Sequence, residues 1–130
     1  MTEAEARIQP ENAIDAFFAG KPPGPIPNSV WVEGCYLEAY FLNKQVYFGG
    51  IWVPPESRGQ GLASRLLQEF LAAMDRYGMT TFCHAAPYDN TARGLDSSAL
   101  SAWYQRHGFI PDPTVYLGLI RPPKPPRCNE

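Results

Sequence analysis

The sequence has little cysteine and no long apolar run, and these two shortages narrow its class. Its cysteines, Cys35, Cys83 and Cys128, are sparse and lack Cys-x-x-Cys spacing, so neither a disulfide framework nor a metal site is expected. No apolar run approaches the roughly 20 residues of a membrane span. The acidic start from Met1 to Glu5 lacks the basic and apolar regions of a signal peptide. We therefore expect a cytoplasmic protein that has no membrane partner.

An excess of one charge is also lacking. The 11 basic and 13 acidic residues give a formal net charge of -2, which argues against nucleic acid as the main partner. Proline, in contrast, is plentiful: 14 prolines gather mainly at 22–27 and 122–126, which predicts two extended, stiff connectors. A length of 130 residues suits one packed domain. We expect that domain at 1–121 and a proline-rich tail at 122–130, for which binding to an aromatic groove is the alternative role.

The segment from Val53 to Leu67 is the most informative part of the chain. It combines the end of an apolar strand, a turn punctuated by glycine, and the start of an amphipathic helix. Such a turn leaves backbone N–H groups unpaired at a helix N-terminus, where a phosphate is well bound. The spacing Arg58-x-x-Gly61-x-Ala63 fits neither the nucleotide triphosphate loop nor the dinucleotide fingerprint.

This turn resembles the Gln/Arg-x-x-Gly-x-Gly/Ala signature of the GNAT N-acetyltransferase superfamily, whose members bind acetyl-CoA. A second motif of that family follows in the expected order, because a predicted helix ends in Tyr104-x-x-x-Gly108-Phe109. The resemblance covers about residues 45 to 121. It implies an α+β fold, with a mixed and mostly antiparallel sheet flanked by helices, and acetyl-CoA as the co-substrate.

The resemblance also implies which residues meet the cofactor. In the family, the turn's amides hold the pyrophosphate of coenzyme A, and the strand before the turn splays from its neighbour to pair with the pantetheine arm. Carried onto this sequence, the cofactor-binding residues are Trp52, Val53, Arg58, Gly59, Gln60, Gly61, Leu62 and Ala63. The alternative for the Arg58 side chain is that it is solvated, since the family binds the cofactor here through the backbone more than through the charge of the arginine.

Apolar and aromatic patterning predicts the remaining elements. Strands are expected at 31–32, 36–42, 46–53, 79–85 and 115–120, with a further short strand at 6–8. Helices are expected at 10–19, 61–77 and 97–107. Asn43-Lys44 suits a tight hairpin. Gly49-Gly50 predicts either a simple bulge or a place where a ligand approaches the backbone, and the adjoining turn favours the second.

Tyr104 is the candidate general acid. A phenol with an ordinary pKa of about 10 is protonated at neutral pH and matches the basicity of a departing thiolate. The family often places such a tyrosine here. Plain packing of an aromatic ring near a helix end is the alternative. The neighbouring Trp103 is expected to pack in the core.

The general base is harder to assign. No acid or imidazole lies in 46–52, where some relatives place one. Glu38 shares a strand face with Tyr36 and Tyr40 by the two-residue period, Glu33 is nearby in sequence, and His84 ends the strand after the cofactor helix. For each, an exposed carboxylate or a hydrogen-bonded histidine is the alternative. Cys83 and His84 cannot pair directly, because neighbours on a strand face opposite ways.

Two functions of different classes remain open. The first is an acetyl-CoA-dependent N-acetyltransferase, in which a primary amine of a small molecule or protein attacks directly in a ternary complex. The second is an acyl-CoA-binding module that regulates a partner protein with little or no catalysis. The long segment 86–96, with Tyr36 and Tyr40, is the candidate wall for the acceptor. A monomer and a homodimer are both compatible with the sequence.

Overall fold

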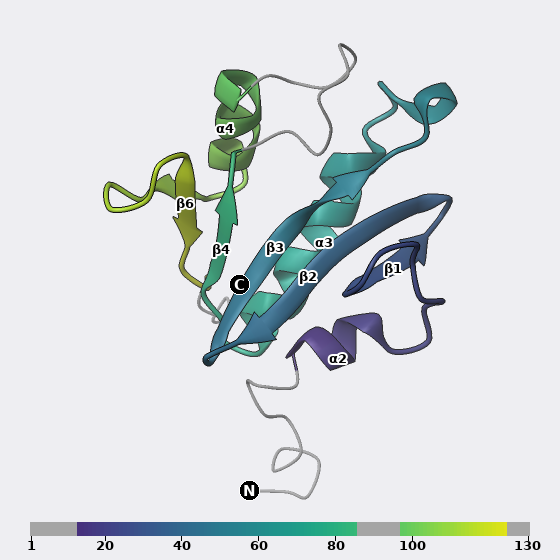
Figure 1. Ribbon diagram of the computed structural model, residues 1–130, viewed down its shortest axis with the longest axis horizontal. Coiled ribbons are helices and arrows are strands. Elements are labelled where there is room, and N and C mark those ends of the chain that lie inside the picture. Colours follow the sequence, from purple (N-terminus) through teal and green to yellow (C-terminus); the bar gives the residue numbers. More distant parts are fainter. Residues whose placement is uncertain (1–12, 86–96, 125–130) are drawn as a thin grey trace, which may run out of the picture.

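The computed structural model describes residues 13–85 and 97–124, which form one sheet with helices packed against it (Figure 1). The helices are α2 (Ala13–Phe18), α3 (Leu62–Arg76), α4 (Ser97–Arg106) and the 3₁₀ turn η2 (Pro55–Ser57). The strands are β1 (Ser29–Val32), β2 (Cys35–Leu42), β3 (Gln45–Trp52), β4 (Thr81–His84), β5 (Ile110–Pro111) and β6 (Gly118–Arg121). The expected strand at 6–8 and the candidate acceptor wall at 86–96 lie outside the described residues.

The six strands follow the order β1-β2-β3-β4-β6-β5. Only β3 and β4 run parallel, and all other neighbours among the described strands are antiparallel. The parallel pairing is short: within residues 13–85 and 97–124 it joins Val46 to Thr81 and Tyr47 to Phe82 and goes no further. Past these pairs β3 and β4 diverge (Figure 1). The predicted α+β fold with a mixed, mostly antiparallel sheet is therefore confirmed.

The β2–β3 hairpin is built as its turn residues predict. Asn43 and Lys44 have φ values of 53° and 64°, and Leu42 pairs with Gln45 across the turn. Positive φ at both central residues is typical of the type I′ turn, whose twist matches that of the flanking strands. This turn sets the register of the whole hairpin.

A bulge then shifts that register midway along the hairpin. Ala39 pairs with Phe48, but Glu38 pairs with Gly50, so Gly49 is the extra residue on β3. A Cβ atom on Gly49 would clash with the Glu38 side chain, at Oε1 and at Cδ. The bulge, which was the alternative not favoured from the sequence, is present, and the group that approaches the backbone at this glycine is the Glu38 side chain.

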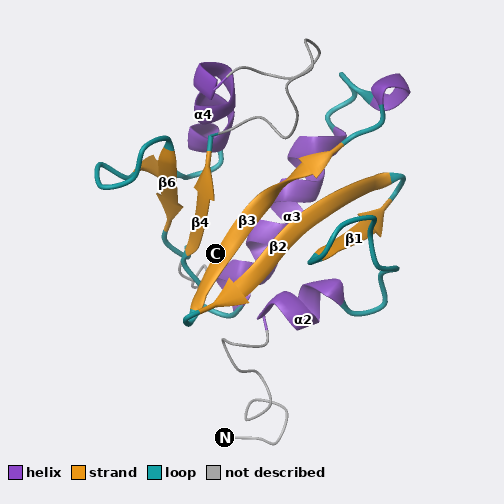
Figure 2. Ribbon diagram, viewed as in Figure 1, coloured by secondary structure: helices purple, strands orange, loops and turns teal. Residues whose placement is uncertain are grey.

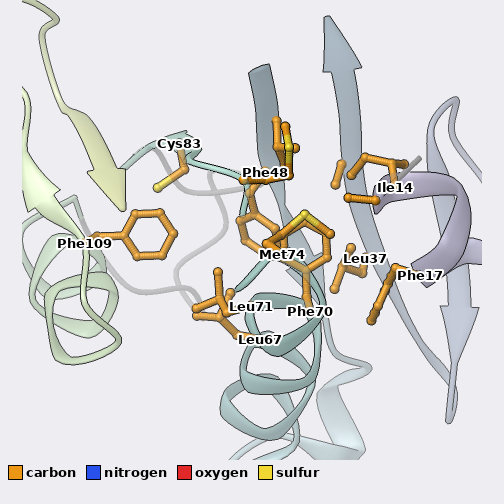
Figure 3. Close-up of a cluster of buried hydrophobic side chains, with 14 of the residues drawn as sticks. Ile14, Phe17, Leu37, Phe48, Leu67, Phe70, Leu71, Met74, Cys83 and Phe109 are labelled. Carbon is orange, nitrogen blue, oxygen red and sulfur yellow. The ribbon is translucent and has the colours of Figure 1, made fainter. Parts of the chain in front are cut away.

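The core lies between the sheet and the helices α2 and α3. The residues of α3 that face it recur with helical spacing and are fully or almost fully buried: Leu66, Leu67, Phe70, Leu71 and Met74. Figure 3 shows Phe70 between side chains of α2 and β3. Its ring centroid lies 5.2 Å from that of Phe17 and 5.3 Å from that of Phe48. The apolar side of this amphipathic helix is therefore buried against the sheet and α2.

Helices α3 and α4 end in the same way. Gly78 has a φ of 68°, and the N–H of Met79 donates to the carbonyl of Met74 at 2.9 Å. At the end of α4, Gly108 has a φ of 99° and the N–H of Phe109 donates to the carbonyl of Tyr104 at 3.3 Å. Both are Schellman ends, in which glycine adopts the left-handed conformation. The predicted glycine stops are confirmed.

The C-terminal strand is shorter than expected. The sequence predicts a strand over 115–120, but β6 begins at Gly118, and residues 112–117 form turns that join it to the unpredicted strand β5. The Asp112 carboxylate accepts hydrogen bonds from the N–H and the hydroxyl of Thr114, at 3.0 and 2.7 Å. Leu117 has a φ of 60°. Local turn chemistry thus overrides the β propensity of Val115 and its neighbours. The other predicted elements within the described ranges are present, with ends shifted by a few residues.

None of the helices in 13–85 and 97–124 is both long and apolar enough to cross a membrane. Of the predicted tail 122–130, only 122–124 fall within the described residues.

Candidate active site

The turn between β3 and α3 is closed by an arginine side chain. Nε of Arg58 donates to the carbonyl oxygen of Val53 at 2.9 Å. The η2 turn lies between these two residues, so the bond fixes the path by which the chain leaves the sheet. The Arg58 side chain is therefore a part of the turn's structure and not the freely solvated group that was one of the two expectations.

The same turn presents backbone donors at an uncapped helix end. Gly59 and Gly61 have φ values of 83° and 79°, and Gly61 is the N-cap residue of α3 without a side-chain capping bond. The first N–H groups of a helix have no intrahelical acceptor. A Cβ atom at either glycine would meet nothing within 4 Å, so open space lies beside the turn. These features fit a pyrophosphate, because backbone donors and the positive end of the helix dipole meet there.

Arg65 also lies at this helix end, and the sequence motifs did not single it out. Its guanidinium forms an ion pair with the Glu33 carboxylate from the β1–β2 turn, and both side chains are about half exposed. A cation in the first turn of a helix opposes the helix dipole. That unfavourable placement is offset by a nearby anion, which in this structure is the Glu33 carboxylate. The pair engages the Glu33 carboxylate, one of the candidate bases, at the helix end.

Helix α4 is joined to the turn through a tryptophan. Nε1 of Trp103 donates to the hydroxyl oxygen of Ser64 at 2.8 Å. Its partly buried ring also contacts the core cluster, in keeping with the expected packing role. The hydrogen bond fixes α4 against the first turn of α3, so the two predicted motifs of the sequence lie against each other.

Tyr104 is buried among aromatic rings. Its side chain is 3% exposed and its ring centroid lies 6.0 Å from that of Phe48 and 5.2 Å from that of Phe109. Burial, and secondly the electrostatic effect of the nearby Cys83, raise the pKa of Tyr104 well above its ordinary value. The phenol therefore keeps its proton at neutral pH, as a general acid must, but it gives that proton up less readily than a free phenol.

The two candidate bases lie on the other face of the sheet. Cys83 is buried and faces the helices, whereas the next residue, His84, is exposed. Glu38 is half-buried and alternates with the buried Leu37 and Ala39 along β2. The predictions that Cys83 belongs to the core and cannot pair with His84 are consistent with this placement. The structure thus puts the candidate acid and the candidate bases on opposite faces of the sheet.

An ion pair between a buried arginine and a partly buried aspartate fixes the C-terminal end of α4. Arg121, 4% exposed, donates to both carboxylate oxygens of Asp75, at 2.7 and 3.0 Å, and to the carbonyl of His107, at 3.0 Å. Burial alone would raise the pKa of Asp75, but the hydrogen bonds from Arg121 and from the N–H of Lys124 outweigh it and hold that pKa below its ordinary value. The last strand, the end of α3 and the end of α4 are thereby joined.

This combination of a splayed sheet, a glycine turn and an uncapped helix defines a class of protein. The family model described as the acetyltransferase (GNAT) domain matches residues 27–111, which is more than half of the chain. The chain therefore belongs to the GNAT acetyltransferase family. The resemblance inferred from its motifs is confirmed.

A solved structure shows the same fold. The ribosomal-protein-S18-alanine N-acetyltransferase from Escherichia coli aligns with a TM-score of 0.54 and 16% sequence identity, over 89% of this chain and 81% of that one. At that identity the similarity concerns the fold. A search of curated proteins gives no match to this sequence.

Proposed function

We propose that this protein transfers the acetyl group of acetyl-CoA to a primary amine, which attacks directly within a ternary complex. The observation that carries the proposal is the turn at Gly59 and Gly61, with its open space and its uncapped helix, inside the segment that matches the family. It follows β3 at the end where that strand has left β4. The backbone donors for the pyrophosphate therefore lie next to a strand edge that can pair with the pantetheine arm.

Each residue of the turn has a separate part in holding the donor. The N–H groups of Gly59, Gly61, Leu62 and Ala63, with Gln60 between them, bind the pyrophosphate. Arg58 keeps the turn in shape through the Val53 carbonyl. Because Arg58 already occupies the Val53 carbonyl, Val53 contacts the pantetheine through its own N–H, next to the backbone of Trp52. When bound, acetyl-CoA supplies an acetyl thioester, and donors at this strand edge polarise its carbonyl.

Side chains of this protein are the proposed proton donor and proton acceptor. In the transfer, the amine nitrogen forms a bond to the acetyl carbon, the carbon–sulfur bond breaks, and the amine loses one proton while the thiolate gains one. Tyr104 is the proposed donor to the thiolate. Glu38 or His84 is the proposed acceptor of the amine proton, directly or through water. Glu38 and His84 lie on the sheet face opposite Tyr104. The proton of the amine is therefore accepted on one face of the sheet, and the proton for the thiolate is donated from the other.

The cofactor assignment is tested first. Acetyl-CoA at about 100 times its dissociation constant stabilises a fold by about 2.7 kcal/mol, which a thermal shift measures readily. Adenosine monophosphate serves as the control ligand, because it lacks the pyrophosphate and the pantetheine. The absence of any shift with acetyl-CoA would remove the basis of the proposal.

The burial of Tyr104 supports a second candidate function. A tyrosine packed among Phe48, Trp103 and Phe109 is also what an acyl-CoA-binding regulatory module without catalysis would retain. A Tyr104→Phe variant separates the two. Loss of acetyl transfer with retained acetyl-CoA binding supports the acid, whereas unchanged transfer shows that another group protonates the thiolate. Binding of acetyl-CoA without transfer to any amine by the parent protein favours the regulatory module.

A further inference from the structure

The sheet face opposite α2 and α3 carries aromatic side chains and one carboxylate. In Figure 2, α3 passes behind β2 and β3, and no described helix crosses in front of them. We call this surface the aromatic face. Its residues are Trp31, Tyr36, Glu38, Tyr40, Tyr47, Trp52 and Phe82.

Two stacked ring pairs form the centre of the aromatic face. The ring centroids of Tyr36 and Trp52 lie 5.5 Å apart with an interplanar angle of 20°. Those of Tyr40 and Tyr47 lie 5.3 Å apart at 19°. Both are cross-strand pairs in the β2–β3 register. Each pair therefore forms one bar of side chains across the two strands.

Glu38 lies between these two bars. It is two residues from Tyr36 and two from Tyr40, and its cross-strand partner is Gly50, which has no side chain. Its own side chain leans over Gly49, into the space where a Cβ atom would be. The bulge thus places the Glu38 carboxylate between two aromatic pairs, with Gly50 as its register partner.

The aromatic face remains partly open to solvent. Trp31 is 36% exposed and packs edge-on against Tyr36, with ring centroids 5.6 Å apart. Tyr36, Tyr40, Tyr47 and Trp52 are half-buried. Large aromatic rings that are contiguous and partly exposed on a sheet are typical of a binding surface. A purely solvated sheet face would alternate small polar residues with the core residues.

The chemistry of this surface selects a cation. Aromatic ring faces attract alkylammonium groups, and a carboxylate between them adds a charge-assisted hydrogen bond. We propose that the aromatic face binds the acceptor as a small alkylammonium ion, with its nitrogen beside Glu38 and between the Tyr36–Trp52 and Tyr40–Tyr47 pairs. A free small amine fits better than a protein segment, because a single residue of this face, Glu38, separates the two ring pairs along β2.

This inference rests on the proposed function and specifies its acceptor. Trp52 links the two halves, since its side chain belongs to the aromatic face and its backbone to the strand edge expected to meet the pantetheine. An alkylammonium ion must lose a proton before its nitrogen can attack. Glu38 beside that nitrogen is placed to accept the proton, after which the carboxyl group releases it to water.

Choline tests the recognition without any transfer to nitrogen, because its quaternary nitrogen can be neither deprotonated nor acetylated. The neutral control is 3,3-dimethyl-1-butanol, which has the same shape and no charge. Three tryptophan indole N–H signals report the binding by NMR: those of Trp31 and Trp52 lie on the aromatic face and that of Trp103 does not. Choline is expected to shift the first two signals and not the third, and the neutral alcohol is expected to shift none.

Two variants then locate the nitrogen. Glu38→Gln should weaken choline binding about tenfold by removing the charge, and Tyr36→Leu should weaken it by removing a ring. Glu69→Gln, which changes an exposed carboxylate on α3, is the matched control and should bind choline as the parent protein does. A lysine-containing tripeptide as competitor distinguishes the source of the amine.

Several outcomes would overturn the inference. Equal shifts with the neutral alcohol would make the face an apolar surface only, and unchanged affinity in Glu38→Gln would remove the carboxylate from the site. Displacement of choline by the tripeptide more strongly than by n-butylamine would make the acceptor a protein. Choline binding without an acetyl-CoA thermal shift leaves the cation site intact and contradicts the proposed function. An acetyl-CoA thermal shift without choline binding contradicts the cation site and leaves the proposed function standing.

Discussion

The two faces of the β2–β3 hairpin differ sharply although the same strands build both. Toward the helices, Leu37, Ala39, Val46 and Phe48 are at most 3% exposed. On the opposite face, the tyrosines and Glu38 alternate with them and stay half-buried. The alternation of side chains along a strand therefore separates two surfaces, since one face packs in the core and the other is the proposed ligand surface.

This difference between the two faces predicts how variants on each face should behave. A change on the helix-facing side should lower the free energy of unfolding, whereas a change on the aromatic face should alter ligand binding and leave stability closer to that of the parent. The glycine turn of α3 belongs to neither face, and a change there should weaken donor binding at a small cost in stability. The variants below test this separation, from the largest expected effect to the smallest.

Phe70→Ala should have the largest effect on stability. Its fully buried ring contacts Phe17 and Phe48, so truncation leaves a cavity at the centre of the core. We expect a loss of about 4 kcal/mol in the free energy of unfolding, measured by urea denaturation. Tyr40→Ala on the aromatic face is the control and should lose much less. Similar losses for the two variants would contradict the separation of the faces.

Asp75→Ala should come next, with a loss of about 3 kcal/mol, because it leaves the buried Arg121 guanidinium without its carboxylate. The pKa of Asp75 is lowered in the folded state, so its contribution is fully present above the ordinary value of 3.8 and is lost as the pH falls through the lowered value. Urea titrations from neutral to strongly acidic pH measure this. The variant should show a smaller loss of stability over the acidic range than the parent, and parallel curves would exclude the pair as the cause.

Gly61→Ala should cost about 1 kcal/mol of stability, because its φ of 79° strains any residue with a Cβ atom. Gly20→Ala is a close control, since Gly20 has a φ of 78° and an added Cβ atom there would also meet nothing within 4 Å. The two variants should lose similar stability in urea. Only Gly61→Ala should also reduce the thermal shift with acetyl-CoA, and an equal reduction in both would place the donor elsewhere.

Gly49→Ala should have the smallest effect on stability and a clear effect on choline binding. The new Cβ would lie too close to Oε1 and Cδ of Glu38, so the flexible carboxylate must move aside. We expect a cost below about 1 kcal/mol and a several-fold weaker affinity for choline, measured by NMR titration. In the Glu38→Gln background the same change should add little. A full additional loss there would mean that Gly49 acts independently of Glu38.

The local features of the fold and of the donor site could be predicted from the sequence. Asn43-Lys44, Gly78 and Gly108 each mark a backbone conformation that few other residues adopt, and each lies where its pattern predicts. The same holds for Gly59 and Gly61 in the turn. The turn at Asp112 was missed, because its side chain competes for the backbone in a stretch whose β propensity favours a strand.

The sequence by itself determined the family, the glycine turn and the side of β2 on which Glu38 lies, because these depend on spacing and on backbone conformation along a few residues. The tertiary structure decided the partners. Arg65 meets Glu33 across 32 positions, Trp103 meets Ser64 across 39, and Arg121 meets Asp75 across 46. It also decided that Glu38 lies over a glycine between two stacked pairs, since that depends on the bulge in the register. Contacts between distant segments follow from packing, and no local pattern encodes them.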